Sequence, residues 1–352
     1  EKNEKIGGVL TYGIPDFRLS RELIDLLVSR LLDLGVKIKI NSIVGPVITL
    51  NKLFKDGYKS IFIGTGVWNP KKLDIKGETF GHSHYAIDYL KSPKYYSLGK
   101  KVVVIGAGNV AMDAARTAKR NGAEEVYVAY RRDFEDMTAT KHEISEAIEE
   151  GVLFKTFEAP VEIVDDGIIL ARTEKKEVDG KSTVGMIPDS EYLFECDSIL
   201  IAVSQAPKNT IVVNNKGVDT TKRGHIETDE KGHTTKEGVF ACGDCGNDKV
   251  SIAVESIADA RKAADSINAY LYGKELKYKK PYVHERHDLT EDSFEDRERK
   301  YRPQLKEHSP KERKEHFLEI TEGLTEEQAK AAAKKVKVDL EVLPAYMSAP
   351  AA

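Results

Sequence analysis

The stretch from Lys101 to Asp113 constrains the fold more than any other part of the chain. A β-branched run ends in Gly106-x-Gly108-x-x-Ala111 and passes directly into a helical pattern. In such a turn the first glycine bends the chain tightly, the second admits a pyrophosphate, and the small third residue packs the helix on the strand. We therefore predict a β-α-β unit whose helix N-terminus holds a dinucleotide pyrophosphate through Gly106, Gly108, Asn109, Val110 and Ala111.

The next predicted strand, Glu125 to Tyr130, ends in the pair Arg131-Arg132. Enzymes that bind NAD tend to carry an acidic residue here for the ribose 2′-hydroxyl, whereas two guanidiniums suit a 2′-phosphate. Arg131 and Arg132 thus favour NADP(H), with NAD(H) as the alternative. A plainer interpretation is an ordinary β-α-β unit whose glycines serve packing and whose arginines are solvated.

Composition narrows the class of protein. The 352 residues are enough for two domains, and 40% hydrophobic residues can fill their cores. A net charge of -4, from 54 basic and 58 acidic residues, gives no indication of nucleic acid or an anionic membrane as partner. No apolar run is long enough to span a membrane, and the first residues hold no signal-peptide core, so we expect a cytoplasmic protein. Three cysteines fit a reducing compartment.

Periodicity predicts further elements along the chain. Residues 281–314 are dense in charge, so we expect an extended or poorly packed arm there. A capping box, Thr325-Glu-Glu-Gln328, predicts the start of a last helix. The other predicted helices and strands are a helix over Arg21–Leu34 capped by Ser20, a strand over Val36–Ile40, a buried strand from Ser60 to Gly66, a helix over Thr140–Glu150 with Ile144, Ala147 and Ile148 on one face, strands between Val152 and Glu195, a strand over Ser198–Val203, and a helix from about Ser251 to Tyr270.

Several motifs in one order make the chain resemble a family of NAD(P)H-dependent FAD oxidoreductases. Residues 7–19 are similar to the family's glycine-rich loop beside the flavin, and residues 238–244 to its Gly-Asp motif. This family is related to the glutamate synthase small subunit and includes the large subunit of NADH-dependent ferredoxin:NADP oxidoreductase. The resemblance implies that FAD is approached by Gly64, Thr65, Gly66, Gly243, Asp244, Ser251 and Ile252.

The fold that the resemblance implies is α/β, with the glutathione-reductase-like two-domain Rossmann architecture. A NAD(P)-binding domain would be inserted in a discontinuous FAD-binding domain. The expected segments are 1–95 for the first part of the FAD domain, 96–205 for the NAD(P) domain, 206–275 for the returning FAD segment, and 276–352 for a charged arm with a short helix.

The sequence also departs from the family pattern. The family's first Gly-x-Gly-x-x-Gly turn, which holds the FAD pyrophosphate, would precede Gly7 and is not in this sequence. We therefore expect the N-terminal flavin half-domain to be missing because the chain is part of a longer protein. Loss of that half, or its supply by another chain, are the alternatives. Ser204 stands where relatives often carry glycine.

The resemblance implies hydride transfer between NAD(P)H and FAD, with electrons exchanged with an iron-sulfur or ferredoxin-type subunit in a hetero-oligomer. Since the cofactors supply this chemistry, no catalytic side chain is expected. The alternative is a non-catalytic structural or docking module that keeps the fold without flavin.

Cys242 and Cys245 have the spacing of a redox disulfide, but they fall within the Gly-Asp motif and are interpreted as packing residues. Cys196 is interpreted as a buried apolar residue. The histidines, among them His82 and His84, show no metal-binding spacing, so no metal site is expected.

Overall fold

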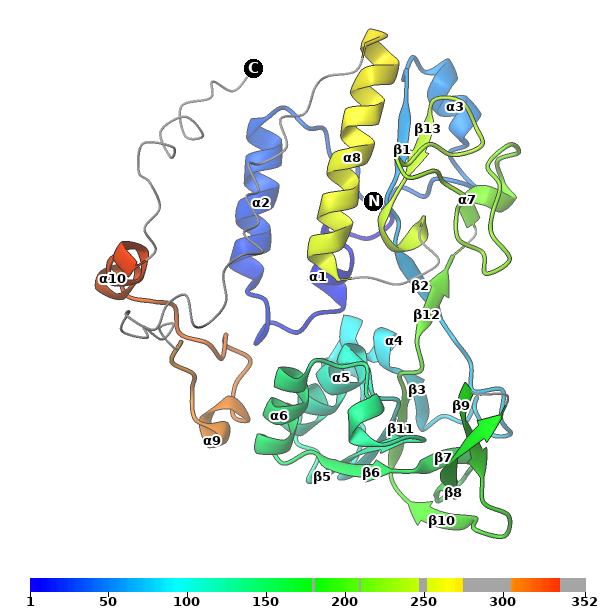
Figure 1. Ribbon diagram of the computed structural model, residues 1–352, viewed down its shortest axis with the longest axis vertical. Helices are drawn as coiled ribbons and strands as arrows, with labels where there is room; N and C mark the ends of the chain where they lie inside the picture. Colours follow the sequence, from blue (N-terminus) through cyan, green and yellow to red (C-terminus); the bar gives the residue numbers. More distant parts are fainter. Residues whose placement is uncertain (179–180, 209, 247–251, 275–304, 336–352) are drawn as a thin grey trace, which may run out of the picture. The chain divides into compact units, whose positions relative to one another are not determined.

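The computed structural model describes residues 1–178, 181–208, 210–246, 252–274 and 305–335 (Figure 1). The chain divides into two compact units. The first unit comprises Glu1–Tyr278 and Pro310–Leu318, and the second comprises Lys279–Ser309 and Glu319–Ala352. None of the described helices is both long and apolar enough to cross a membrane.

A five-stranded parallel sheet forms the centre of the first unit, in the order β3-β11-β4-β5-β6. The central strand β4 is covered on both faces, as expected for a parallel sheet, and its residues Val102, Val103 and Val104 are fully buried. The strands are β3 (Ser83–Tyr85), β11 (Ser198–Ile201), β4 (Lys101–Ile105), β5 (Glu125–Tyr130) and β6 (Leu153–Thr156).

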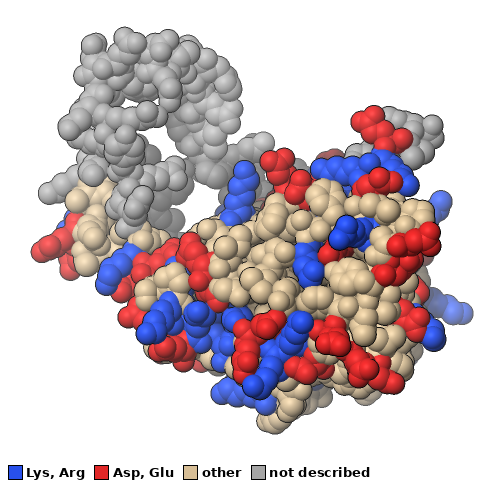
Figure 2. Space-filling view, turned by 90° about the horizontal axis from the view of Figure 1, so that it is seen from below, with Lys and Arg blue, Asp and Glu red and all other residues tan. Residues whose placement is uncertain are grey.

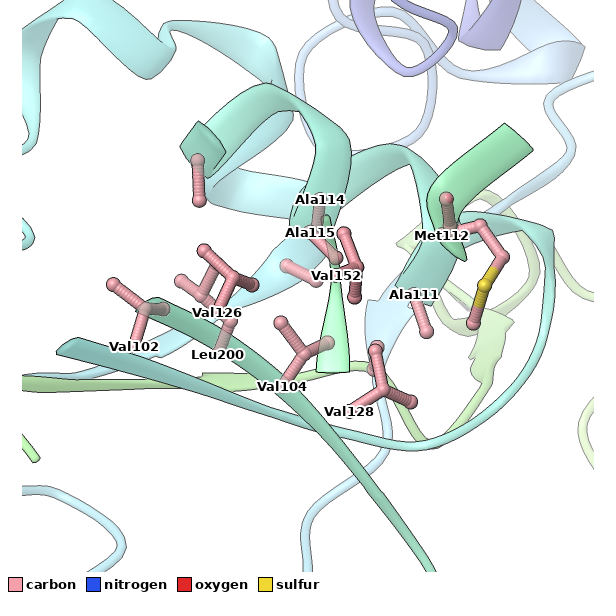
Figure 3. Close-up of a cluster of buried hydrophobic side chains, with 14 of the residues drawn as sticks. Val102, Val104, Ala111, Met112, Ala114, Ala115, Val126, Val128, Val152 and Leu200 are labelled. Atoms are coloured by element: carbon pink, nitrogen blue, oxygen red, sulfur yellow. The ribbon is translucent and has the colours of Figure 1, made fainter. Parts of the chain in front are cut away.

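Helices α4 (Ala86–Lys91), α5 (Asn109–Arg120) and α6 (Lys141–Glu149) lie on one face of this sheet (Figure 1). Small α5 residues such as Ala111 and Ala115 pack against the strand valines, so the helix approaches the sheet closely (Figure 3). The sequence motif therefore forms the β-α-β unit that it predicts.

The other sheet face packs on antiparallel strands. Alternate residues of β4, Val103 and Ile105, share a core with Ile163, Ile168 and Leu170 from these strands. The strands are β7 (Glu158–Val164), β8 (Gly167–Val178), β9 (Lys181–Met186) and β10 (Tyr192–Glu195). Strand β3 and helix α4 pack with the five-stranded sheet, so this sheet includes residues before position 96. The domain bounds expected from the sequence stay a proposal.

A smaller core surrounds two parallel strands, β1 (Ile61–Ile63) and β13 (Val239–Ala241). Helix α8 (Ala253–Tyr272) packs on β13 and on the 3-10 turn η3 (Gly243–Cys245). Two strands, β2 (Val67–Pro70) and β12 (Gln205–Pro207), pair antiparallel between this core and the five-stranded sheet (Figure 1). The remaining helices and turns are α1 (Val9–Tyr12), α2 (Arg21–Asp33), α3 (Leu50–Lys55), η1 (Pro93–Tyr95), η2 (Phe134–Asp136), α7 (Thr210–Val213), α9 (Pro310–Arg313) and α10 (Glu326–Lys335).

Two helix starts expected from the sequence are confirmed. The Ser20 hydroxyl accepts a hydrogen bond from the Glu22 amide at the start of α2. Thr325 and Gln328 exchange the two bonds of a capping box before α10, at 2.9 and 3.2 Å. Local side-chain chemistry thus determines both boundaries.

The strand expected over residues 36–40 is wrong, because this segment pairs with no strand among the described residues. The apolar face expected on α6 is confirmed for Ile144 and Ala147 and wrong for Ile148. Ala147 is fully buried, but Ile148 is 49% exposed while Glu143 and Glu146 are buried. The charged segment 281–314 lies largely outside the described residues, but its Arg313 is buried, so this part is packed. The buried charged side chains of Glu143, Glu146 and Arg313 therefore occupy interior positions where the helical pattern predicts apolar residues.

Candidate functional site

Gly106 turns the chain after β4 in a backbone conformation that requires glycine. Its φ is +125°, and a Cβ there would collide with the carbonyl oxygen of Ala202 and lie 2.9 Å from the carbonyl carbon. The Gly106 amide donates to the Ala129 carbonyl oxygen at 3.1 Å, which ties the turn to β5. Gly106 therefore shapes the turn through the close approach of neighbouring strand ends.

The N-terminus of α5 is open. Gly108 is its N-cap residue, with φ -93° and no side-chain cap. A Cβ at Gly108 would meet Thr138 Oγ1 at 3.4 Å and otherwise open space, so the missing side chain leaves room beside the first-turn amides. Such a helix end attracts an anion through its unpaired N–H groups and its dipole. The geometry fits a pyrophosphate.

The other residues of the turn contribute differently. The Asn109 side chain accepts a hydrogen bond from the Thr140 amide at 3.1 Å, which leaves its backbone amide, with that of Val110, at the helix start. Ala111 is fully buried and its amide donates to the Gly108 carbonyl oxygen at 2.9 Å. Ala111 therefore contributes to the packing of α5 on the sheet.

Arg131 and Arg132 lie at the same sheet edge as this turn, since β5 pairs in parallel with β4 and both strands end there. The backbone is anchored, because the Arg131 carbonyl accepts from Thr173 and the Arg132 carbonyl accepts from Phe157. Within the described part of the chain, neither guanidinium lies within ion-pair distance of a carboxylate, although Arg132 interacts electrostatically with Asp136, which itself pairs with Lys175 at 2.9 Å. Two cations at this edge are thus available to a phosphate. The face of the molecule shown in Figure 2 carries basic and acidic side chains mixed together.

A second pair of parallel strand ends brings together most of the residues expected beside FAD. Since β1 and β13 run in register, Gly64–Gly66 and Gly243–Asp244 leave the sheet at one edge. Gly66 and Gly243 have φ values of +63° and +66°, which glycine adopts without strain. The thiol of Cys245 donates to the Ile63 carbonyl oxygen at 3.4 Å and joins the two strand ends.

Ile252 is the N-cap residue of α8 and is 56% exposed, with no side-chain cap at this helix start. Ser251, which the resemblance also assigned to FAD, lies outside the described residues. The structure therefore adds a second helix N-terminus without a side-chain cap near the Gly-Asp turn, because α8 packs on η3.

Sequence reasoning missed Trp68. Its ring atoms lie 4.0 Å from the Cβ positions that side chains would take at Gly8 and at Gly66, so Trp68 separates the glycine-rich loop from the β1 end. Its position two residues after Gly66, as the only tryptophan of the chain, was a signal in the sequence. Ser204 adopts a φ of +97°, a backbone conformation that favours glycine.

The cysteines have the properties of packing residues. Burial raises the pKa of Cys242 to about 11 and that of Cys196 to about 12, and burial also raises the pKa of Cys245. A redox-active Cys-x-x-Cys pair needs a lowered thiolate pKa, so these directions favour the packing interpretation. Cys196 is buried, as expected.

Comparison with known proteins agrees with this geometry. The family described as Pyridine nucleotide-disulphide oxidoreductase matches residues 22–265, which include both strand-end clusters. The chain belongs to this family.

Relatives within the family include the glutamate synthase [NADPH] small chain of Escherichia coli (strain K12), 32% identical over 299 residues. That alignment covers 77% of this chain and 62% of the relative, so the chain spans less than two thirds of its length. The NADP(+)-dependent formate dehydrogenase subunit beta of Moorella thermoacetica is 34% identical over 279 residues, covering 75% of this chain and 39% of that one. The expected kinship with glutamate synthase small chains is confirmed.

Solved structures show the same fold. FprA of Mycobacterium tuberculosis in complex with NADPH aligns with a TM-score of 0.64 at 17% identity, covering 78% of this chain and 77% of FprA. Thioredoxin reductase of T. acidophilum aligns with a TM-score of 0.54 at 22% identity, covering 77% and 88%. The α/β architecture of FAD/NAD(P)-linked reductases, predicted from the sequence, is thereby confirmed.

Proposed function

We propose that this chain forms the NADP(H)-binding domain and part of the FAD-binding domain of a flavoprotein oxidoreductase, which passes hydride between NAD(P)H and FAD. One observation carries the proposal: the uncapped N-terminus of α5 lies at the same sheet edge as Arg131 and Arg132, neither of which pairs with a described carboxylate.

The pyrophosphate and the 2′-phosphate of NADP(H) each suit a different group of residues at this sheet edge. The open space at Gly108 admits the pyrophosphate to the amides of Asn109 and Val110. The two guanidiniums suit the 2′-phosphate because their planar donors match phosphate oxygens. When bound, the nicotinamide and the flavin supply the hydride chemistry, and the residues of this chain bind and orient them.

FAD fits in part. Gly64–Gly66, Gly243–Asp244 and Ile252 suit the ribityl and ring end of a flavin, which the resemblance assigns to them. Residues 1–95, all of which the structure describes, contain no second strand-turn-helix unit with a glycine-rich turn that could hold the FAD pyrophosphate. We therefore propose that this unit is supplied by sequence outside the 352 residues, in keeping with the 62% coverage of the glutamate synthase small chain.

The electron partner is proposed from the names of the relatives. They include subunits of larger enzymes, such as the formate dehydrogenase subunit beta and the NADPH-Fe(3+) oxidoreductase subunit beta of Geobacter sulfurreducens. We propose that this protein likewise exchanges electrons with an iron-sulfur or ferredoxin-type subunit in a hetero-oligomer. The cytoplasmic location stays a prediction.

The test for flavin is an absorbance spectrum near about 450 nm, taken on the 352-residue chain and on a longer protein that carries a preceding strand-turn-helix unit. The chain alone should purify colourless, since most FAD contacts fall on the missing unit, whereas the longer protein should be yellow. Stoichiometric FAD on the chain alone would refute the placement of the missing unit. A colourless longer protein would favour the docking-module alternative.

A further inference from the structure

A buried ionic cluster joins the flavin-side loop to the nucleotide-binding sheet. Arg18, from the segment that resembles the glycine-rich flavin loop, contacts two carboxylates of the nucleotide domain. Its Nη1 donates to both oxygens of Asp113 on α5, at 2.9 and 2.8 Å, and its Nη2 lies 2.5 Å from Glu143 on α6. The side chains of Asp113 and Glu143 are only 4% and 8% exposed. Arg18 thus joins the segment of residues 7–19 to both α5 and α6.

The neighbouring residue inserts into the same junction. Phe17 is fully buried, and its ring lies 4.8 Å from the guanidinium carbon of Arg116 and 3.8 Å from that of Arg120. Both guanidiniums are held by the fully buried Glu150, Arg116 at 2.8 and 3.1 Å. The ring therefore packs against cations whose orientation is already determined, which is a favourable cation-π arrangement.

Residues 310–318 cover this junction from outside. The Phe317 ring centroid lies 6.3 Å from that of Phe17, and Arg120 donates to the His316 carbonyl oxygen at 3.1 Å. Arg313 is only 4% exposed at its side chain and lies 2.9 Å from Glu149 of α6. Residues 17–18, helices α5 and α6, and residues 310–318 therefore contact one another although they are far apart in the sequence.

We infer that Arg18 is a positioning residue: its bridge to Asp113 and Glu143 sets the orientation of the NADP(H)-binding helix α5 relative to the flavin-side segment. Asp113 is one helical turn beyond Asn109, where the pyrophosphate is proposed to bind, so a rotation of α5 against the loop must break the bridge. Breaking it leaves the buried carboxyl group of Asp113 without its hydrogen-bond donor, whereas Glu143 keeps its bond to Arg116 at 3.0 Å, and the loss at Asp113 disfavours other orientations. The inference rests on the proposed function, since its consequence is the distance from nicotinamide to flavin.

The first test uses the single tryptophan of the 352-residue chain. Trp68 adjoins the flavin-side loop at Gly8, and its emission overlaps the absorption of NADPH, so energy transfer reports their separation. Arg18→Met should shift the Trp68 lifetime at saturating NADPH, while the Kd for NADPH changes less than about threefold because the bridge is separate from the proposed pyrophosphate contacts. Arg30→Met is the matched control, since Arg30 is exposed on α2 and its guanidinium has no hydrogen bond or ion pair among the described residues.

An unchanged lifetime in Arg18→Met refutes the inference and leaves the proposed function intact. If NADPH does not bind to the unaltered chain, the proposed function and the inference both fail. Arg18→Lys guards against misfolding, because lysine keeps the charge but cannot bridge two carboxylates with a planar fork. The Trp68 fluorescence lifetime of Arg18→Lys should lie between those of the wild type and Arg18→Met.

The second test measures flavin reduction in the FAD-loaded longer protein. At saturating NADPH, Arg18→Met should slow the reduction on the order of 10-fold or more, because hydride transfer depends steeply on geometry. Arg18→Lys should recover part of the rate, and Arg30→Met should match the wild type. A rate that is slow only at low NADPH and equals the wild-type rate at saturation would indicate a binding defect and overturn the positioning role.

Discussion

Replacing Gly106 by alanine should destabilise the fold, whereas replacing Gly108, two residues away, should spare it. Gly106 has a φ of +125° and its new Cβ would lie 2.9 Å from the Ala202 carbonyl carbon, on backbone that continues β11. The disfavoured φ costs about 1–3 kcal/mol and the overpacking another 1–3 kcal/mol, so Gly106→Ala should lower the free energy of unfolding by about 2–6 kcal/mol.

Gly108→Ala provides the matched control. Its φ of -93° is open to alanine, and the new Cβ meets only Thr138 Oγ1, at 3.4 Å. The free energy of unfolding should therefore change by less than about 1 kcal/mol. The methyl group would instead stand where a pyrophosphate is proposed to approach, so the Kd for NADPH should rise about 10-fold or more, which is about 1.4 kcal/mol.

Urea unfolding followed by circular dichroism measures the first effect, with an unchanged m-value as the sign that only stability has changed. Calorimetric titration with NADPH measures the second. If Gly106→Ala costs less than about 1 kcal/mol, the steric account of the turn is wrong. If Gly108→Ala binds NADPH as tightly as the wild type, the dinucleotide does not rest on this helix end.

Three further predictions concern single features. Ser20→Ala should lower the free energy of unfolding by about 1 kcal/mol in urea, since it removes the cap of α2, and no change would show that the cap contributes nothing. Replacing Cys242 and Cys245 by serine should leave NADPH oxidation by the flavin-loaded protein largely intact, and two thiols appearing on reduction in the wild type would contradict this. Burial raises the pKa of Asp113 from 3.8 to about 7, although the nearby Arg18 guanidinium acts to lower this pKa. Because the pKa is higher in the folded state, protonated Asp113 stabilises the fold fully below pH 3.8, and this stabilisation is lost as the pH rises through 7. Asp113→Asn should remove this slope, at most about 1.4 kcal/mol per pH unit, in unfolding measured from about pH 5 to about pH 8, and an identical slope in both proteins would refute it.

The β-α-β unit could be predicted from sequence because its determinants are local. Gly106, Gly108 and Ala111 each meet a requirement set by residues a few positions away, and the buried valines of β4 follow directly from a continuous apolar run. The parallel register of β5 then places Arg131 and Arg132 at the same edge. The nucleotide half of the candidate site therefore needed no long-range information.

The failures have long-range causes. Residues 36–40 have the composition of a strand, but a strand needs a neighbour to satisfy its backbone, and none is found among the described residues. Glu143 and Glu146 are buried because Arg116 of α5 pairs with both, at 3.0 and 2.8 Å, which helical periodicity cannot show. The bridge from Arg18 likewise spans 95 residues of sequence. Charge pairs between distant segments are the part of this fold that pattern analysis could not supply.

The central claim is tested most directly by calorimetric titration of the 352-residue chain with NADPH and with NADH, alongside the double variant Arg131→Ala and Arg132→Ala. One NADPH should bind per chain, more tightly than NADH, and the double variant should lose about 1.5–3 kcal/mol of NADPH binding for each charge-assisted bond removed, with NADH affected little. Equal NADPH affinity in the wild type and the double variant, or no binding of either dinucleotide, would contradict the account.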